Sequence, residues 1–73
     1  MERILIVSSN EKFGGMISEL ILSMFSPQLT LLHSGSEARR GIQHMEYDII
    51  IINAPLSDEF GNELALQIAE DSM

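Results

Sequence analysis

The sequence predicts an α/β domain built on a parallel β-sheet. Short apolar runs of strand length alternate with longer segments in which apolar residues recur every three or four positions, the spacing of one helix face. The run at Ile49–Ile52 consists of four isoleucines without polar alternation, which is typical of a parallel strand covered on both faces. Three strands alternating with three helices give the order βαβαβα, with right-handed crossovers between the parallel strands.

The first strand is predicted at residues 3–7, RILIV, which are rich in β-branched residues. A helix follows, and it should end near the last residue of its apolar face because Pro27 cannot continue it. Two caps compete for its start: Asn10, or Ser8 with Glu11 at capping-box spacing. The predicted apolar face consists of Phe13, Met16, Ile17, Leu20, Ile21, Met24 and Phe25.

A second strand and two more helices complete the predicted elements. Residues 28–33, QLTLLH, form a less uniformly apolar strand, which favours a position at a sheet edge. The next helix starts at residue 36 or 37 and runs to about residue 46, and a third helix begins near residues 60–62. In the second helix the inner residues are Ala38, Ile42 and Met45, and the outward residues are Glu37, Arg39, Arg40 and Gln43. In the third helix the residues sharing one face are Leu64, Ala65, Ile68 and Ala69.

The strand at Ile49–Ile52 is interpreted as the central, buried strand around which the chain is organised. Asn53 follows at its carboxyl end, and an irregular loop begins there and continues through Pro55. In open parallel sheets, ligands and chemistry are found at the carboxyl ends of the strands. Asn53 is therefore the first candidate for a functional side chain, and it is an amide and not an acid.

Composition narrows the classes of function. The 73 residues form a single domain, 1–73, with a small core, and the absence of cysteines and of zinc-ligand spacing removes disulfides and structural metals as sources of stability. Assembly with another chain is the remaining source. The net charge of −7, with four Lys and Arg residues, argues against direct nucleic-acid binding by this segment. Since no apolar run approaches about 18 residues and no signal-peptide pattern follows Met1, we expect a cytoplasmic protein without membrane attachment.

Two motifs resemble the receiver domain of response regulators, which has a flavodoxin-like fold with five parallel strands in the order 2-1-3-4-5. The first is ILIVSSN at Ile4–Asn10, where the family usually has ILIVDDN. The second is YDIIIINAPLSDEFGNEL at Tyr47–Leu64, where the family has a pattern like PDLVLLDIMLPDMDGLEL. The likeness covers the whole chain but only the family's first three-fifths, so it implies a truncated, three-stranded part of a receiver. The segment NAPLSDEFGNELAL resembles receivers of antitermination regulators that carry a carboxyl-terminal RNA-binding ANTAR module.

The resemblance also implies that the residues which do chemistry in the family are replaced here. Ser8 and Ser9 stand where receivers have an acidic pair that holds Mg²⁺, and Asn53 stands where they have the aspartate that accepts the phosphoryl group. Hydroxyls and an amide offer Mg²⁺ no charge, and an amide is a poor nucleophile toward phosphorus. The Thr or Ser and the Lys that the family supplies from its fourth and fifth strands would lie beyond Met73. We therefore expect no enzyme activity, no metal and no cofactor.

Other interpretations of the same residues stay open. Asn53 is also suited to capping loop backbone groups, and Ser8 and Ser9 suit helix capping better than nucleophilic chemistry. The polar loop before Gly14 and Gly15 suggests an alternative function, a flavodoxin-like protein that binds a phosphate or nucleotide at a helix start. The acidic residues near this edge could also bind a cation weakly; they are Glu11, Asp58 and Glu59.

The expected function is that of a non-catalytic pseudo-receiver, which signals through protein contacts and regulates transcription or antitermination. An output module, such as an RNA-binding domain, is expected if the native chain is longer. In the order 2-1-3 the third strand is left at an edge. Complete burial of one isoleucine stabilises the folded state by about 1.5 to 3 kcal/mol, so leaving four of them half uncovered would cost several kcal/mol of stability. The sequence thus predicts a symmetric homodimer or a swapped assembly, in which a second copy covers the edge at Asp48–Asn53 or the adjoining apolar faces.

Overall fold

Strands and helices alternate along the chain in the order that the sequence predicts. The computed structural model describes residues 2–71. Its elements are β1 (Arg3–Ser8), α1 (Glu11–Met24), β2 (Gln28–Leu32), α2 (Gly35–His44), β3 (Ile49–Asn53) and α3 (Asn62–Asp71). The α/β class and the βαβαβα order are confirmed, and the element ends differ from the predicted ones by one or two residues.

The three strands form one parallel sheet in the order β2-β1-β3. This is the predicted order, and it matches the first three strands of a flavodoxin-like sheet. The interpretation of β3 as the central, buried strand is wrong for the described residues, because β1 holds that place. The prediction that the third strand lies at an edge in the order 2-1-3 is confirmed for the same residues. Residues 4–8 of β1 are all buried, whereas Ile49 of β3 is 44% exposed. A continuous apolar run does not distinguish a central strand from an edge strand that has one open side.

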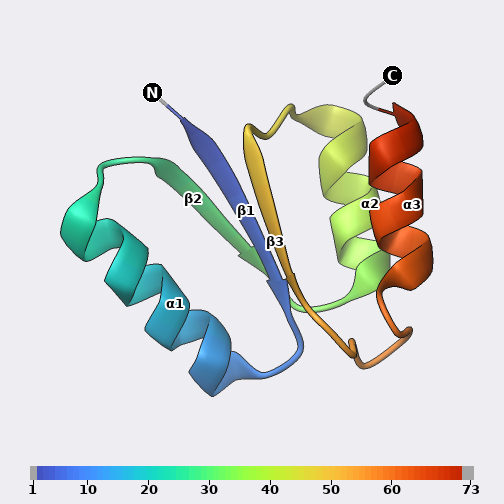
Figure 1. Ribbon diagram of the computed structural model, residues 1–73, viewed down its shortest axis with the longest axis horizontal. Helices are drawn as coiled ribbons and strands as arrows, with labels where there is room; N and C mark the ends of the chain where they lie inside the picture. The colour runs from blue at the N-terminus through green and yellow to red at the C-terminus, as the bar shows by residue number, and fades with distance from the viewer. Residues whose placement is uncertain (1, 72–73) are drawn as a thin grey trace.

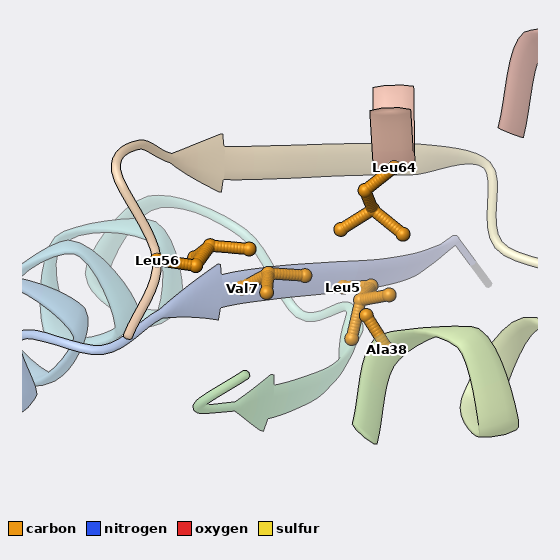
Figure 2. Packing of buried hydrophobic residues seen from close by; sticks show 5 residues of the cluster. All are labelled: Leu5, Val7, Ala38, Leu56 and Leu64. Atoms are coloured by element: carbon orange, nitrogen blue, oxygen red, sulfur yellow. The ribbon is translucent and has the colours of Figure 1, made fainter. Parts of the chain in front are cut away.

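The helices lie on both faces of the sheet (Figure 1). The helices α2 and α3 lie side by side on one face, and α1 lies alone on the other. Strand geometry turns alternate residues of β1 to opposite faces, so Leu5 and Val7 point toward α2 and α3. There they form the main core with buried residues of α2, α3 and the loop after β3 (Figure 2). The members of this core are Leu5, Val7, Ala38, Leu56 and Leu64.

The predicted apolar faces of the helices are wider than the faces that pack. In α1, Ile17 and Ile21 are half-buried, but Met16, Leu20 and Met24 are each more than half exposed. In α3, Leu64 is buried and Ile68 half-buried, while Ala65 and Ala69 are exposed. The periodicity therefore identifies each helix correctly but overestimates how much of it the 73-residue chain covers.

The prediction that Met45 belongs to the inner face of α2 is wrong. This helix ends at His44, and Met45 adopts an extended conformation while its backbone N–H still donates to Gly41 O. Its side chain is 44% exposed. None of the helices in residues 2–71 is long and apolar enough to cross a membrane.

Candidate functional site

Two of the three candidate residues meet at the carboxyl ends of β1 and β3. Ser8 and Asn53 are register partners at the last positions of these parallel strands. The Asn53 amide nitrogen, Nδ2, donates a hydrogen bond of 3.1 Å to Ser8 Oγ. The residues that the resemblance aligns with a metal ligand and with the phosphoryl acceptor of a receiver are thus joined by a neutral contact.

The Ser8 hydroxyl has its full set of partners. Ser8 is completely buried, and its Oγ donates to Asn10 O at 3.0 Å. The same oxygen accepts from Asn10 N at 3.2 Å and from Asn53 Nδ2. A hydroxyl has one donor hydrogen and two acceptor lone pairs, so these three bonds saturate it. It retains no lone pair for a metal ion.

Ser9 takes part in a different set of contacts. Its hydroxyl donates to His33 O at 2.6 Å and accepts from Ser57 N at 2.7 Å. Ser9 therefore ties the loop before α1 to the end of β2 and to the loop after β3. The resemblance groups Ser9 with Ser8 and Asn53, but the Ser9 hydroxyl bonds to the backbone of His33 and Ser57, whereas Ser8 and Asn53 bond to each other.

The hydroxyl of Ser8 donates to a backbone oxygen and not to a base among the residues that the structure describes. The ring nitrogen Nδ1 of His33 lies 3.3 Å from the backbone oxygen of Ser8 and not from its hydroxyl. A general base must reach the proton that it removes, and the hydroxyl proton of Ser8 is directed to Asn10 O. This geometry favours the structural interpretation of Ser8 over the nucleophilic one.

The start of α1 is capped by Asn10. Its Oδ1 accepts from Phe13 N at 3.1 Å, which decides between the two predicted caps. The capping box is wrong because Ser8 is the last residue of β1 and its hydroxyl is directed to Asn10. A phosphate bound here would have to displace this cap and would lie beside Glu11 in the first turn. The start of α1 is therefore poorly suited to a phosphate.

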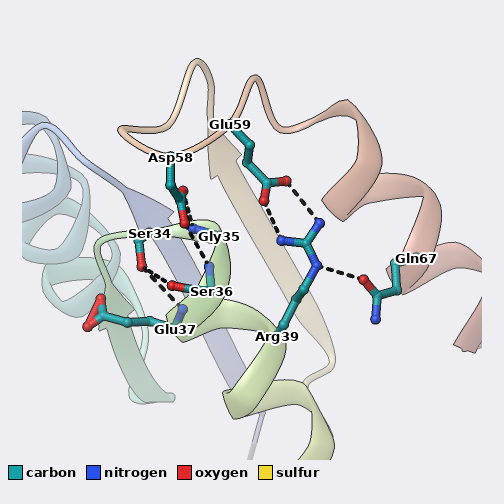
Figure 3. Close-up of polar contacts among 8 residues, drawn as sticks. All are labelled: Ser34, Gly35, Ser36, Glu37, Arg39, Asp58, Glu59 and Gln67. Atoms are coloured by element: carbon teal, nitrogen blue, oxygen red, sulfur yellow. Dashed lines mark hydrogen bonds and ion pairs between the residues drawn. The ribbon is translucent and has the colours of Figure 1, made fainter.

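Asp58, in the loop after β3, caps the start of α2 from a distance in sequence. Its two carboxylate oxygens accept from Gly35 N at 2.8 Å and from Ser36 N at 3.1 Å (Figure 3). Ser34 is the N-cap of the same helix and accepts from Glu37 N at 3.2 Å. The bonds from Gly35 and Ser36 hold the pKa of Asp58 below its usual value, because they stabilise the charged carboxylate.

Arg39 of α2 joins the same loop to α3. It forms a two-pronged ion pair with Glu59, and its Nε donates to Gln67 Oε1 at 2.7 Å (Figure 3). The bond to Glu59 raises the pKa of Arg39. The prediction that Arg39 points outward is wrong: its side chain is only 28% exposed and lies between α2 and α3.

The weak cation site suggested by Glu11, Asp58 and Glu59 finds no support. The Asp58 carboxylate accepts a hydrogen bond from the start of α2, and the Glu59 carboxylate pairs with Arg39. Within residues 2–71, no group of three or more His, Cys, Asp or Glu side chains is placed to hold a metal ion. The acidic residues of this loop attach it to the neighbouring helices.

We expect the replacement Asp58→Asn to destabilise the protein at neutral pH and to matter progressively less in acid. The folded-state pKa of Asp58 lies below its unfolded value, which is about 3.9. The stabilisation of the folded state by the Asp58 carboxylate is therefore fully present above the pKa of the unfolded chain. It is lost as the pH falls through the pKa of the folded protein. Denaturant unfolding of both proteins between pH 7 and pH 2 measures the difference.

The variant Glu70→Gln is the control, because it removes one negative charge at an exposed position in α3. Its unfolding curve should differ from the wild-type curve far less than that of Asp58→Asn at neutral pH. A constant difference between wild type and Asp58→Asn down to pH 2 would contradict the capping role.

At the ends of β1 and β3, the side chains of Ser8 and Asn53 are thus neutral and bonded to each other. Such an arrangement can position loops and present a surface, but it offers neither a charged metal ligand nor a nucleophile. Comparison with known proteins finds no matching family model, no matching curated protein and no matching solved structure, so the likeness to receivers rests on the two sequence motifs.

Proposed function

We propose that this chain is a non-catalytic, receiver-like module that acts in the cytoplasm through contacts with other proteins. The observation that carries the proposal is the hydrogen bond between Asn53 and Ser8 at the ends of β3 and β1. A working receiver needs carboxylates at both places, whereas here an amide donates to a hydroxyl. The module would transmit a signal by binding, without accepting a phosphoryl group.

The chemistry of the side chains supports this proposal. A carboxylate can attack phosphorus because it has an available negative oxygen, whereas the lone pairs of the Asn53 amide are delocalised. Magnesium is usually held by one or two carboxylates, and Ser8 has no lone pair left to offer. Both reactions of a receiver pocket, metal binding and phosphoryl acceptance, are unfavourable on these residues.

The proposed role is regulatory, in transcription or antitermination. With a net charge of −7, this segment is a poor match for a phosphate backbone. Any contact with RNA would belong to an output module, such as the RNA-binding ANTAR module of the regulators that its second motif resembles. The partners of the segment itself would be proteins.

We expect no phosphorylation when the protein is incubated with Mg²⁺ and acetyl phosphate. Intact-mass spectrometry should detect no added phosphate group, because neither Asn53 nor Ser8 can act as acceptor. An added phosphate that mild hydroxylamine removes, as it removes an acyl phosphate, would contradict the proposal. A phosphate that resists hydroxylamine would indicate transfer to a hydroxyl and would also contradict it.

The matched variant Ser8→Asp/Asn53→Asp tests the receiver geometry itself. Two carboxylates at these register partners should create a Mg²⁺ site, and saturating Mg²⁺ at about 100 times its dissociation constant would stabilise the variant by about 2.7 kcal/mol. Thermal unfolding with and without Mg²⁺ measures this, with the wild type and Asn53→Asp as controls. A doubly substituted variant that folds but gains no stability from Mg²⁺ would argue against a receiver origin for the pocket.

A further inference from the structure

The loop between β3 and α3 presents an aromatic side chain to solvent. Phe60 is 78% exposed, more than any other large apolar residue that the structure describes. Gly61, which follows it, is buried and has a φ of 93°, in the left-handed region that favours glycine. A Cβ at Gly61 would lie 3.3 Å from the Ala54 side chain. The chain thus turns inward at Gly61 and leaves the side chain of Phe60 outside.

Contacts on the amino-terminal side of Phe60 hold this loop in place. Asp58 accepts from the backbone at the start of α2, and Glu59 pairs with Arg39 (Figure 3). Leu56 N donates to Glu59 O at 2.7 Å, and the Leu56 side chain belongs to the main core. A group on an ordered loop loses less conformational freedom when a partner binds, so more of its contact energy appears as affinity. Phe60 is therefore a preorganised contact.

A hollow of about 340 Å³ lies beside Phe60. Its lining consists of the consecutive residues 58–63, which include the carboxylates of Asp58, Glu59 and Glu63. Pockets that enclose small molecules and cofactors have volumes of about 300 to 1,000 Å³. The hollow is at the lower end of this range, so it suits a single long side chain of a partner better than a cofactor.

The lining of the hollow carries a surplus of negative charge. The hydrogen bond to Glu59 raises the pKa of Arg39 most, and the charges of Glu63 and Asp58 raise it further, so the three carboxylates lie near one guanidinium. The starts of α2 and α3 add about half a positive charge each, which leaves the balance negative. Glu63 is exposed and forms no ion pair with any residue from 2 to 71. The hollow is thus complementary to a cation.

We propose that this hollow, the Phe60 hollow, receives an arginine side chain of a basic partner protein. A guanidinium can stack on an aromatic ring while it donates to carboxylates, which fits an exposed ring among acidic groups. The net charge of −7 would draw a basic partner toward the chain. The inference rests on the proposed function, because it takes the partner to be a protein, and it adds the place and the chemistry of the contact.

A short arginine peptide tests the Phe60 hollow directly. The probe is the acetylated and amidated pentapeptide Gly-Arg-Gly-Arg-Gly, added at low salt to isotope-labelled protein whose backbone amide signals are followed by NMR. At about 10 mM peptide, a site with a dissociation constant of about 1 mM is nearly full. We expect saturable shifts centred on residues 58–63. The same peptide with citrulline in place of arginine, which has a similar shape without the charge, should cause no such shifts.

Matched variants separate the contribution of the ring from that of the charge. Phe60→Leu keeps an apolar side chain without a π-system and should weaken binding about two- to fivefold, whereas Phe60→Tyr should bind like the wild type. Glu63→Gln should weaken binding by a similar factor. Glu70→Gln makes the same change of charge at an exposed position of α3 outside the hollow, and it should leave the affinity nearly unchanged.

Several results would overturn the proposal. Shifts that are absent, or centred on another part of the chain, would show that the hollow does not take a guanidinium. Equal binding of the citrulline peptide would show that charge is not recognised, and equal affinities of Phe60→Leu and wild type would show that the ring is not. The phosphorylation experiment tests the proposed function separately, so the two failures can be told apart. Circular dichroism of each variant verifies that it is folded.

Discussion

Replacing Leu64 by alanine should lower the free energy of unfolding by about 2 to 5 kcal/mol, the range observed when a buried leucine is truncated. Leu64 is fully buried and is the residue by which α3 enters the main core, next to Leu5 and Val7 of β1 (Figure 2). Truncation removes apolar contacts and leaves a cavity that this small core has few other side chains to fill.

Such a loss is large for this chain. A domain of 73 residues has about 4 to 11 kcal/mol of stability in total, so Leu64→Ala should leave a substantial unfolded fraction at 37 °C. Chemical denaturation at fixed protein concentration measures the change. The control is Leu66→Ala on the same helix. Leu66 is 63% exposed, so this substitution should change the free energy of unfolding by less than about 0.5 kcal/mol. Equal effects of the two substitutions would mean that α3 does not dock through Leu64.

The order of elements and of strands could be predicted because the signals for them are local. The run at residues 4–7 and the isoleucines of β3 indicate parallel strands, and the three- and four-residue spacing in α1 indicates a helix. The strand order followed from the receiver-like motifs. Which strand is central could not be read from the apolar runs, because the runs of β1 and β3 are equally apolar and differ only in their neighbours.

The contacts that fix the loop after β3 could not be predicted. Asp58 bonds to a helix start 22 and 23 residues earlier, and Arg39 pairs with Glu59 across 20 residues. No local spacing relates such positions, and charged residues in a loop or on a helix are most often solvated. In the candidate site, the meeting of Ser8 with Asn53 was predictable from strand ends, whereas the direction of the Ser9 hydroxyl depends on the loops around it.

The second large effect is expected from Ser8→Ala. This substitution should lower the free energy of unfolding by about 1 to 3 kcal/mol, although it removes a single oxygen atom. That oxygen accepts from Asn53 Nδ2 and from Asn10 N, and it lies in a fully buried residue. Removing it leaves the amide of the half-buried Asn53 without this acceptor, and an unsatisfied donor shielded from water costs more than its hydrogen bond contributes. The control Ser23→Ala removes an exposed hydroxyl that bonds only to Leu20 O among the described residues, and it should be nearly neutral.

A double-mutant cycle with Asn53→Ala separates the Ser8–Asn53 contact from the other bonds of Ser8. When the Asn53 amide has been removed, loss of the Ser8 hydroxyl leaves only Asn10 N without its acceptor. Asn10 is exposed, so its N–H can bond to water. The two substitutions together should therefore cost less than the sum of their separate effects, with a coupling of about 0.5 to 3 kcal/mol. Unfolding of the four proteins in denaturant gives this coupling directly. Strictly additive costs would mean that Asn53 and Ser8 are not bonded in solution, and a receiver-like pocket at the ends of β1 and β3 would then be open to ligands.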